Sequence, residues 1–104
     1  MYKLVETESF SQWLSGLKDR NTRARLLLRL SKVSLGNLGD HRAVGHDVWE
    51  MREFFGPGWR MYYIQHEGAV IMMLGGGNKS SQKKDIERTK TLAREIRNEP
   101  DPSI

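Results

Sequence analysis

Three strand-like runs follow one another in the second half of the chain, separated only by tight turns. The runs are VWEMREFF (48–55), WRMYYIQH (59–66) and AVIMMLG (69–75). Gly-Pro-Gly at 56–58 is typical of a type II turn, and Glu67-Gly68 suits a hairpin. Because such turns join antiparallel strands, the pattern predicts an antiparallel meander. The last run is apolar from 69 to 74, which indicates a central strand covered on both faces.

Side chains alternate between the two faces of a strand, so the spacing also predicts which residues share a face. We expect helices to cover the more apolar face, which carries Trp49, Met51, Trp59, Met61 and Tyr63. The opposite face is expected to stay open, and it carries Glu50, Arg52, Arg60 and Tyr62.

Helical spacing appears before and after these strands. A short strand and three helices are predicted at 2–7, 10–17, 22–35 and 81–98. Trp13 lies in the apolar stripe of the first helix and is predicted to be in the core. In the second helix the predicted core face carries Ala24, Leu27, Leu28 and Leu35, widened by Leu26, Leu30 and Val33. Between these helices and the meander, 37–47 has no periodicity and is predicted to be a loop.

The order strand, two helices, three strands and helix predicts a small α+β domain whose helices pack on one face of an antiparallel sheet. A length of 104 residues allows one core, so we expect a single domain at 1–98. Two prolines follow, at 100 and 102, and predict a flexible tail at 99–104.

Composition narrows the class of protein. The chain has no cysteine, which fits a reducing cytoplasm and excludes disulfides and thiolate sites. It has neither a membrane-length apolar run nor a signal-peptide pattern at its start, so we expect a cytoplasmic protein without membrane contact. His41 and His46 are poorly spaced for metal binding, and we expect neither a metal nor another cofactor.

Positive charge is concentrated in two segments that are predicted to be helical. Residues 18–32 carry six basic residues and one acid, and residues 79–97 carry seven basic residues and three acids. Segregated basic charge suits a nucleic-acid backbone or an acidic protein, although two solvated helix faces would give the same pattern. In the first segment Arg25, Arg29 and Lys32 form a basic ridge, which makes them candidate RNA-binding residues.

The loop LGGGNKSSQKKD at 74–85 leads from the last strand into the last helix. It matches neither a P-loop nor a dinucleotide-binding motif, so we expect its glycines to permit a bend and a close approach of another backbone. Serines can cap the helix, yet Lys79, Lys83 and Lys84 place positive charge at its positive end. Either these lysines extend into water, or an anion binds among them and the unpaired amides.

Arg52, Arg60 and Lys79 could converge on one surface of a simple meander. Arginine and lysine both bind phosphate, and Tyr62 could transfer a proton or stack on a base. This set fits metal-independent cleavage of RNA, in which cations stabilise the transition state that follows attack by a 2′-hydroxyl.

The run from Val48 to Lys90 resembles the HigB-like "addiction module killer" branch of the RelE/ParE toxin superfamily. The resemblance rests on the strand EMR, the hairpin GPGWRMYY and the helix entry GGGNKSSQKKDI. It implies a toxin of a type II toxin–antitoxin pair, neutralised by an antitoxin that is often of the helix-turn-helix type. RelE-like members cleave mRNA on the ribosome, whereas ParE-like members inhibit DNA gyrase without cleaving RNA.

The resemblance carries over Arg60 and Lys79 as catalytic cations, and it also matches Arg52, Lys83 and Lys84. Several RNase members place a Tyr or His near the C-terminus, whereas 98–104 here contains neither. The general base therefore stays open among Glu50, Tyr62 and a lysine. The leading interpretation is a ribosome-associated mRNA endonuclease toxin. The alternatives are a gyrase inhibitor and an inactive module that binds RNA or a protein partner.

Overall fold

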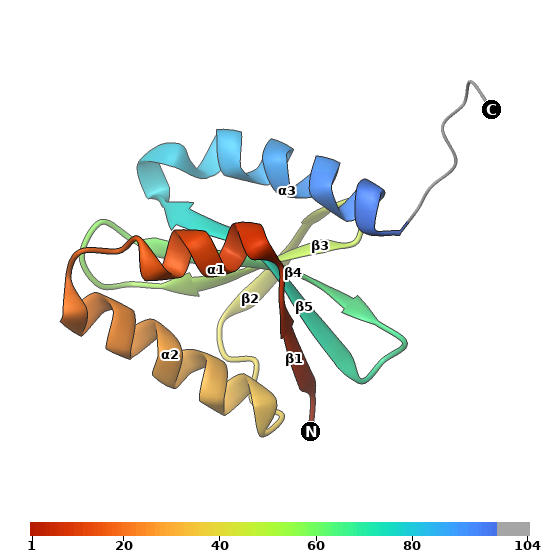
Figure 1. The fold of residues 1–104 in the computed structure, drawn as a ribbon, viewed down its shortest axis with the longest axis horizontal. Coiled ribbons are helices and arrows are strands. Elements are labelled where there is room, and N and C mark those ends of the chain that lie inside the picture. The colour runs from red at the N-terminus through yellow and green to blue at the C-terminus, as the bar shows by residue number, and fades with distance from the viewer. Residues whose placement is uncertain (98–104) are drawn as a thin grey trace.

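The structure, a computed structural model, describes residues 1–97 as one mixed β-sheet with helices on both of its faces (Figure 1). In chain order its elements are β1 (Lys3–Glu6), α1 (Glu8–Ser15), α2 (Arg20–Ser34), β2 (His41–Gly45), β3 (Val48–Glu53), β4 (Trp59–His66), β5 (Val70–Asn78), the single turn η1 (Lys79–Ser81) and α3 (Gln82–Ile96). The tail predicted at 99–104 lies outside the described residues. Within them, no helix combines the length and apolar character of a membrane span.

The strand order in the sheet is β1-β5-β4-β3-β2. The predicted meander is confirmed, because β3 pairs antiparallel with β4 and β4 with β5. The sheet is not purely antiparallel, however, since β1 pairs in parallel with β5. A parallel pair needs a long connection, and here α1, α2 and three strands lie between its two members.

The segment 37–47 is not only a loop, because it contains the edge strand β2, paired antiparallel with β3. The turn between the two strands is His46-Asp47, and both residues have positive φ, at 52° and 62°. Positive φ at both central residues is the geometry of a type I′ hairpin turn. The usual Asn-Gly or Asp-Gly signal is absent here, which is why the sequence pattern missed the hairpin.

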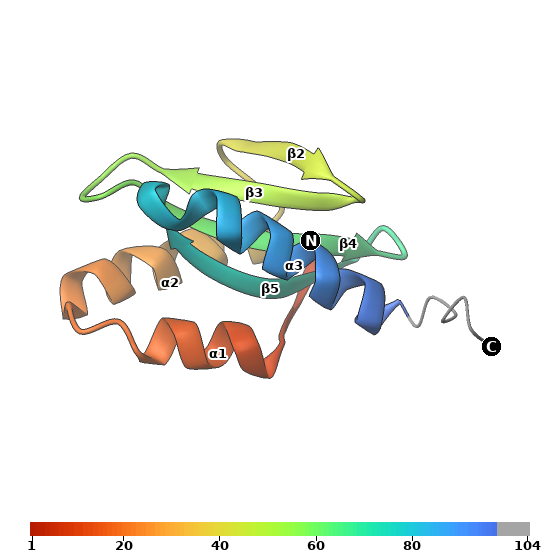
Figure 2. The ribbon, with the colours of Figure 1, turned by 90° about the horizontal axis from the view of Figure 1, so that it is seen from above.

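Helices cover both faces of the sheet, and this corrects the expectation that they pack on one face. Buried residues of α1 and α2 form a core with Met51, Met61 and Tyr63, whereas α3 packs over Val48, Tyr62 and Ile64. Figures 1 and 2 show α1 and α2 together on one side of the strands and α3 apart from them. The predicted alternation of β3 and β4 is confirmed, but the face that was expected to be open is covered in part by α3.

The core face of α2 differs from the predicted one. Leu26, Leu30 and Val33 are buried, whereas Leu28 is 58% exposed, so its prediction as a core residue was wrong. Leucines are spread over about half of the circumference of this helix, so periodicity alone could not choose the buried side. Trp13 does pack against the core as predicted, with its ring 6.2 Å from that of Trp59.

The glycines at the end of β5 make room for side chains on both faces of the sheet. A Cβ on Gly76 would overlap the ring of Trp13, and one on Gly77 would overlap the carboxylate of Asp85. Neither glycine has positive φ, so a close approach rather than a special bend requires them. The approach predicted from sequence is real, but side chains rather than another backbone make it.

Candidate functional site

The register of the central strands brings Arg60 and Lys79 to the same turn. Arg60 pairs with Gly77 across β4 and β5, and Lys79 begins immediately after β5 ends. The Nη1 of Arg60 donates a hydrogen bond to the carbonyl of Gly58 at 2.7 Å, and the Lys79 amide donates to the carbonyl of Pro57 at 3.4 Å. A Cβ on Gly58 would lie 3.0 Å from Arg60 Nη1 and 3.5 Å from Lys79 Cβ. The guanidinium of Arg60 and the base of the Lys79 side chain therefore flank one glycine at the end of the meander.

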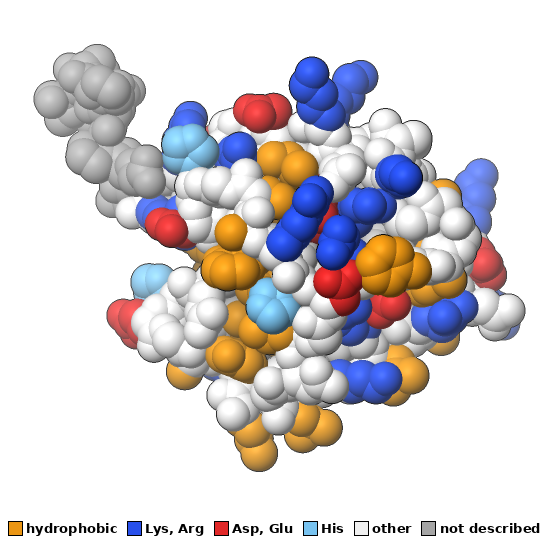
Figure 3. Space-filling view, turned by 180° about the vertical axis from the view of Figure 1, so that it is seen from behind, with side chains coloured by type: hydrophobic (Ala, Val, Ile, Leu, Met, Phe, Trp, Pro, Cys, Tyr) orange, Lys and Arg blue, Asp and Glu red, His pale blue; other side chains and the backbone are white. Residues whose placement is uncertain are grey.

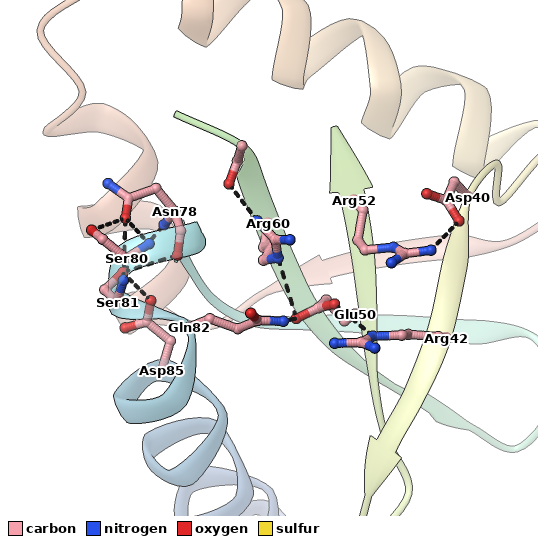
Figure 4. Close-up of polar contacts among 11 residues, drawn as sticks. Asp40, Arg42, Glu50, Arg52, Arg60, Asn78, Ser80, Ser81, Gln82 and Asp85 are labelled. Atoms are coloured by element: carbon pink, nitrogen blue, oxygen red, sulfur yellow. Dashed lines mark hydrogen bonds and ion pairs between the residues drawn. The ribbon is translucent and has the colours of Figure 1, made fainter. Parts of the chain in front are cut away.

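Glu50 lies beneath this pair and is completely buried. Its Oε1 accepts a hydrogen bond from Nε of Arg42 at 3.0 Å, and its Oε2 accepts one from Nε2 of Gln82 at 2.9 Å (Figure 4). The Nε of Arg60 lies 3.7 Å from Oε2. Glu50 thus holds Arg60 from below and ties the first residue of α3 to the sheet.

Arg42 and Gln82 are site residues that sequence reasoning missed. Arg42 was hidden in the segment expected to be a loop, and it faces Glu50 only because β2 pairs with β3. Gln82 belongs to the helix entry KSSQ, where the lysines drew attention instead. No local pattern could have linked Gln82 to a carboxylate 32 residues away.

Tyr62 is also buried, and its hydroxyl has no hydrogen-bond partner among residues 1–97. Burial raises the pKa of the Tyr62 phenol well above its ordinary value, and the neighbouring Glu50 carboxylate raises it further. The phenol is therefore neutral at physiological pH. Both candidate bases on this face, Glu50 and Tyr62, are shielded from solvent, which contradicts the expectation that they sit on an open surface.

Arg52 lies opposite Arg60 across β3 and β4. It is partly exposed, and its Nη2 lies 3.1 Å from Oδ1 of Asp40. Its guanidinium also stands 5.5 Å from the ring of exposed Phe54. Arg52 therefore belongs to the same face as Arg60, but an acid on the neighbouring loop already engages it.

The start of α3 differs from a bare helix N-terminus. The side chain of Asn78 accepts hydrogen bonds from the amides of Ser80 and Ser81, so these donors are already satisfied. Ser81 does not cap α3; its hydroxyl instead donates to the buried carboxylate of Asp85 at 2.6 Å. Lys83 and Lys84 are exposed. An anion at this place would therefore meet lysine side chains rather than those two amides.

The basic ridge predicted on α2 is not one surface. Arg29 is only 8% exposed, and its guanidinium donates to the carbonyls of Arg52, Leu38 and Asp40 and pairs with Glu53. This corrects its expected role, because its Nη1 and Nη2 already donate four hydrogen bonds to loop and strand and have none left for RNA. Arg25 and Lys32 are exposed, and Arg25 lies 3.7 Å above the ring of Phe55.

Basic side chains gather on the face of the molecule that points away from α1 and α2, with a few acids among them (Figure 3). Lys79 and Lys83 are exposed and Arg52 is partly exposed, whereas Arg60, which was expected on an open face, is only 8% exposed. Within 1–97, no group of three or more His, Asp or Glu residues gathers that could hold a metal. The arrangement can bind a phosphodiester through cations and stabilise negative charge that develops on it.

The fold defined here is that of the toxin RelE. An E. coli RelE mutant in the free state is 19% identical, with a TM-score of 0.65 over 88% of this chain and 97% of that one. A chain of the intact E. coli RelBE toxin–antitoxin complex is 20% identical, with a TM-score of 0.63 over 75% of this chain and 96% of that one. At these identities the likeness shows the fold alone.

Sequence comparison then places the chain in a family. An uncharacterized protein of Haemophilus influenzae is 38% identical over 94 residues, which cover 90% of this chain and 95% of that protein. The chain belongs to the same family as this protein. No protein-family model matches the sequence.

Proposed function

We propose that this protein is the toxin of a type II toxin–antitoxin pair and that it arrests translation by cleaving mRNA on the ribosome. The RelE fold supports this proposal, because one of the similar structures comes from a toxin–antitoxin complex. The motif from Val48 to Lys90 supports placement in the HigB-like branch. The proposed partners are a cognate antitoxin of the helix-turn-helix type, the ribosome and mRNA, all in the cytoplasm.

The observation that carries the proposal is the pairing of Arg60 and Lys79 around Gly58. Arg60 is fixed by the Gly58 carbonyl and the Glu50 carboxylate, while its Nη2 donates no hydrogen bond within the described residues. Lys79 is exposed beside it. In the proposed reaction the 2′-hydroxyl gives its proton to water as its oxygen attacks the neighbouring phosphorus. The P–O5′ bond then breaks, the 5′-oxygen takes up a proton from water and leaves, and a 2′,3′-cyclic phosphate remains. Both cations stabilise the charge on the phosphorane. This chemistry requires no metal.

The burial of Glu50 and Tyr62 limits which residues can contact the substrate. Neither group reaches a substrate bound at the surface, and Tyr62 holds its proton at physiological pH. We therefore assign Arg60 and Lys79 to the phosphate and give Glu50 a positioning role. Among the three candidates for the general base, namely Glu50, Tyr62 and a lysine, the lysines at 79, 83 and 84 are exposed.

The test is expression of the protein and of single variants in a bacterial host, with growth, primer extension on cellular mRNA and plasmid supercoiling measured together. Arg60→Ala and Lys79→Ala should each reduce cleavage about 10²–10³-fold. Arg60→Lys should restore only part of it, because the planar fork of donors is lost. Lys3→Ala is a matched control, since Lys3 is exposed and pairs with Val70 at the far end of β5 from Lys79.

Each outcome separates the candidate functions. Cuts in mRNA that disappear in Arg60→Ala but persist in Lys3→Ala support the proposed nuclease. Growth arrest with intact mRNA and altered supercoiling would establish gyrase inhibition instead. Full cleavage by a folded double variant of Arg60 and Lys79 would refute this site.

A further inference from the structure

One side of α2 carries leucines that no other described element covers. Leu27, Leu28 and Leu35 are 47%, 58% and 72% exposed. Ala24 and Ser31 are exposed on the same side. Figure 1 shows α2 at the edge of the molecule, with the side that faces away from the sheet free of other elements. Exposed leucines that adjoin one another, rather than being scattered singly, mark an interaction surface.

The spacing of these residues is that of a helix–helix seam. Ala24, Leu28, Ser31 and Leu35 follow one another at intervals of four, three and four residues. At 3.6 residues per turn they fall within about 60° of one another around the axis. This 4–3–4 pattern is the one by which two helices interlock side chains in a coiled coil. The buried side of α2 is separate and uses Leu26, Leu30 and Val33.

The charge beside this seam is of one sign. The helix contains five basic residues and no acid. Arg29 is buried, and Arg23 donates to the carbonyl of Leu17, which leaves Arg20, Arg25 and Lys32 exposed. By helical geometry Arg25 and Lys32 follow one flank of the seam and Arg20 borders the other. A partner helix would therefore meet positive charge on both sides of its apolar contact.

We propose that the seam Ala24–Leu28–Ser31–Leu35 docks an amphipathic helix of a partner protein, whose own leucine-type seam is flanked by Asp and Glu. Acidic flanks complement Arg20, Arg25 and Lys32 and set the choice of partner, as flanking charges do in coiled coils. This seam lies on the helix layer opposite α3, so it is separate from the face that carries Arg60.

Other occupants fit the surface less well. A second copy of this chain would bring Arg20, Arg25 and Lys32 against their own counterparts, which costs free energy. A lipid surface would favour a broader apolar face with aromatic anchors, whereas this seam is narrow and interrupted by Ser31. RNA would leave the exposed leucines in water.

The test uses two synthetic helical peptides that share leucines at 4–3 spacing, one flanked by glutamate and its twin flanked by lysine. We expect the full-length protein to bind the glutamate peptide at least about tenfold more tightly than the twin, a difference of roughly 1.4 kcal/mol. Leu28→Gln should weaken that binding about tenfold. Phe54→Gln, which alters an exposed apolar side chain outside the seam, should leave it unchanged.

Charge reversal gives a second readout with a defined sign. Lys32→Glu should lower the affinity for the glutamate peptide and raise it for the lysine twin. Melting curves check that each variant is folded, and Leu35→Gln replaces Leu28→Gln if the latter melts early. Equal binding of both peptides, or none, would overturn the proposal. So would leucine-dependent binding to anionic phospholipid vesicles, or leucine-dependent self-association in sedimentation, without a preference for the glutamate peptide.

Discussion

The guanidinium of Arg60 lies 3.7 Å from the carboxylate of Glu50, and Glu50 has no exposed surface. The carboxylate also accepts hydrogen bonds from Arg42 and Gln82, so its lone pairs are engaged on several sides. Burying a charge is costly unless it is paired in this way. The arrangement therefore makes Glu50 a support for Arg60 rather than a group that meets the substrate.

Glu50→Gln should distinguish the positioning of Arg60 by Glu50 from the electrostatic effect of the carboxylate on RNA binding. Losing an acid makes the site more positive, so electrostatics alone predicts tighter RNA binding. The loss of the anchor for Arg60 predicts slower cleavage, and we expect kcat to fall about 10–100-fold while KM stays constant or falls. Cleavage rates and fluorescence anisotropy with one RNA oligonucleotide measure the two effects. A lower affinity at unchanged kcat would contradict a positioning role.

Neighbouring glycines should respond differently to the same substitution. Gly76→Ala would force a Cβ into the ring of Trp13 and should lower the free energy of unfolding by about 1–3 kcal/mol. Gly75→Ala is the matched control, because its Cβ would lie 3.4 Å from the methyl group of Thr89, an ordinary contact. Urea denaturation of both variants checks the difference. Equal stability of the two would mean that Trp13 does not pack on Gly76 in solution.

Replacing two leucines on opposite sides of α2 by alanine should lower the stability of the protein by different amounts. Leu26 is fully buried, so Leu26→Ala should cost roughly 2–5 kcal/mol through lost burial and a cavity. Leu28 is more than half exposed, so Leu28→Ala should change stability by less than about 1 kcal/mol. Thermal melts of the isolated protein measure both. A large loss of stability in Leu28→Ala would mean that this side of α2 is buried rather than exposed.

Alkaline pH should weaken the fold through its buried tyrosines. Burial raises the pKa of Tyr63 to about 12, and burial also raises the pKa of Tyr62. The folded state then keeps protons that the unfolded chain loses above its ordinary pKa of about 10, so stability is intact below that pH and falls as pH rises toward 12. Tyr63→Phe should make the decline shallower. Denaturation between pH 9 and 12, with phenolate absorbance, provides the measurement.

The sequence by itself determined the properties that depend on local spacing. The alternation in β3 and β4 fixed that Trp59 and Met61 share one face and Arg60 and Tyr62 the other, because side chains alternate at every residue of a strand. The turns at 56–58 and 67–68 predicted the antiparallel meander, which the pairing of β3 with β4 and of β4 with β5 confirms. The sequence also places Lys79 directly after the last strand. Local spacing alone therefore predicts that Arg60 and Lys79 lie close together.

Tertiary structure alone decided what covers each face and which groups stay in water. The helix α3 crosses to the face of Tyr62 and buries Glu50, and a hydrogen bond from Gln82 fixes that crossing. The parallel pairing of β1 with β5 and the buried side of α2 are likewise set by contacts between distant segments. Local periodicity fixes which residues share a surface, but burial is a competition between whole surfaces. For that reason the exposed seam of α2 and the buried carboxylate beneath Arg60 emerge only in the folded chain.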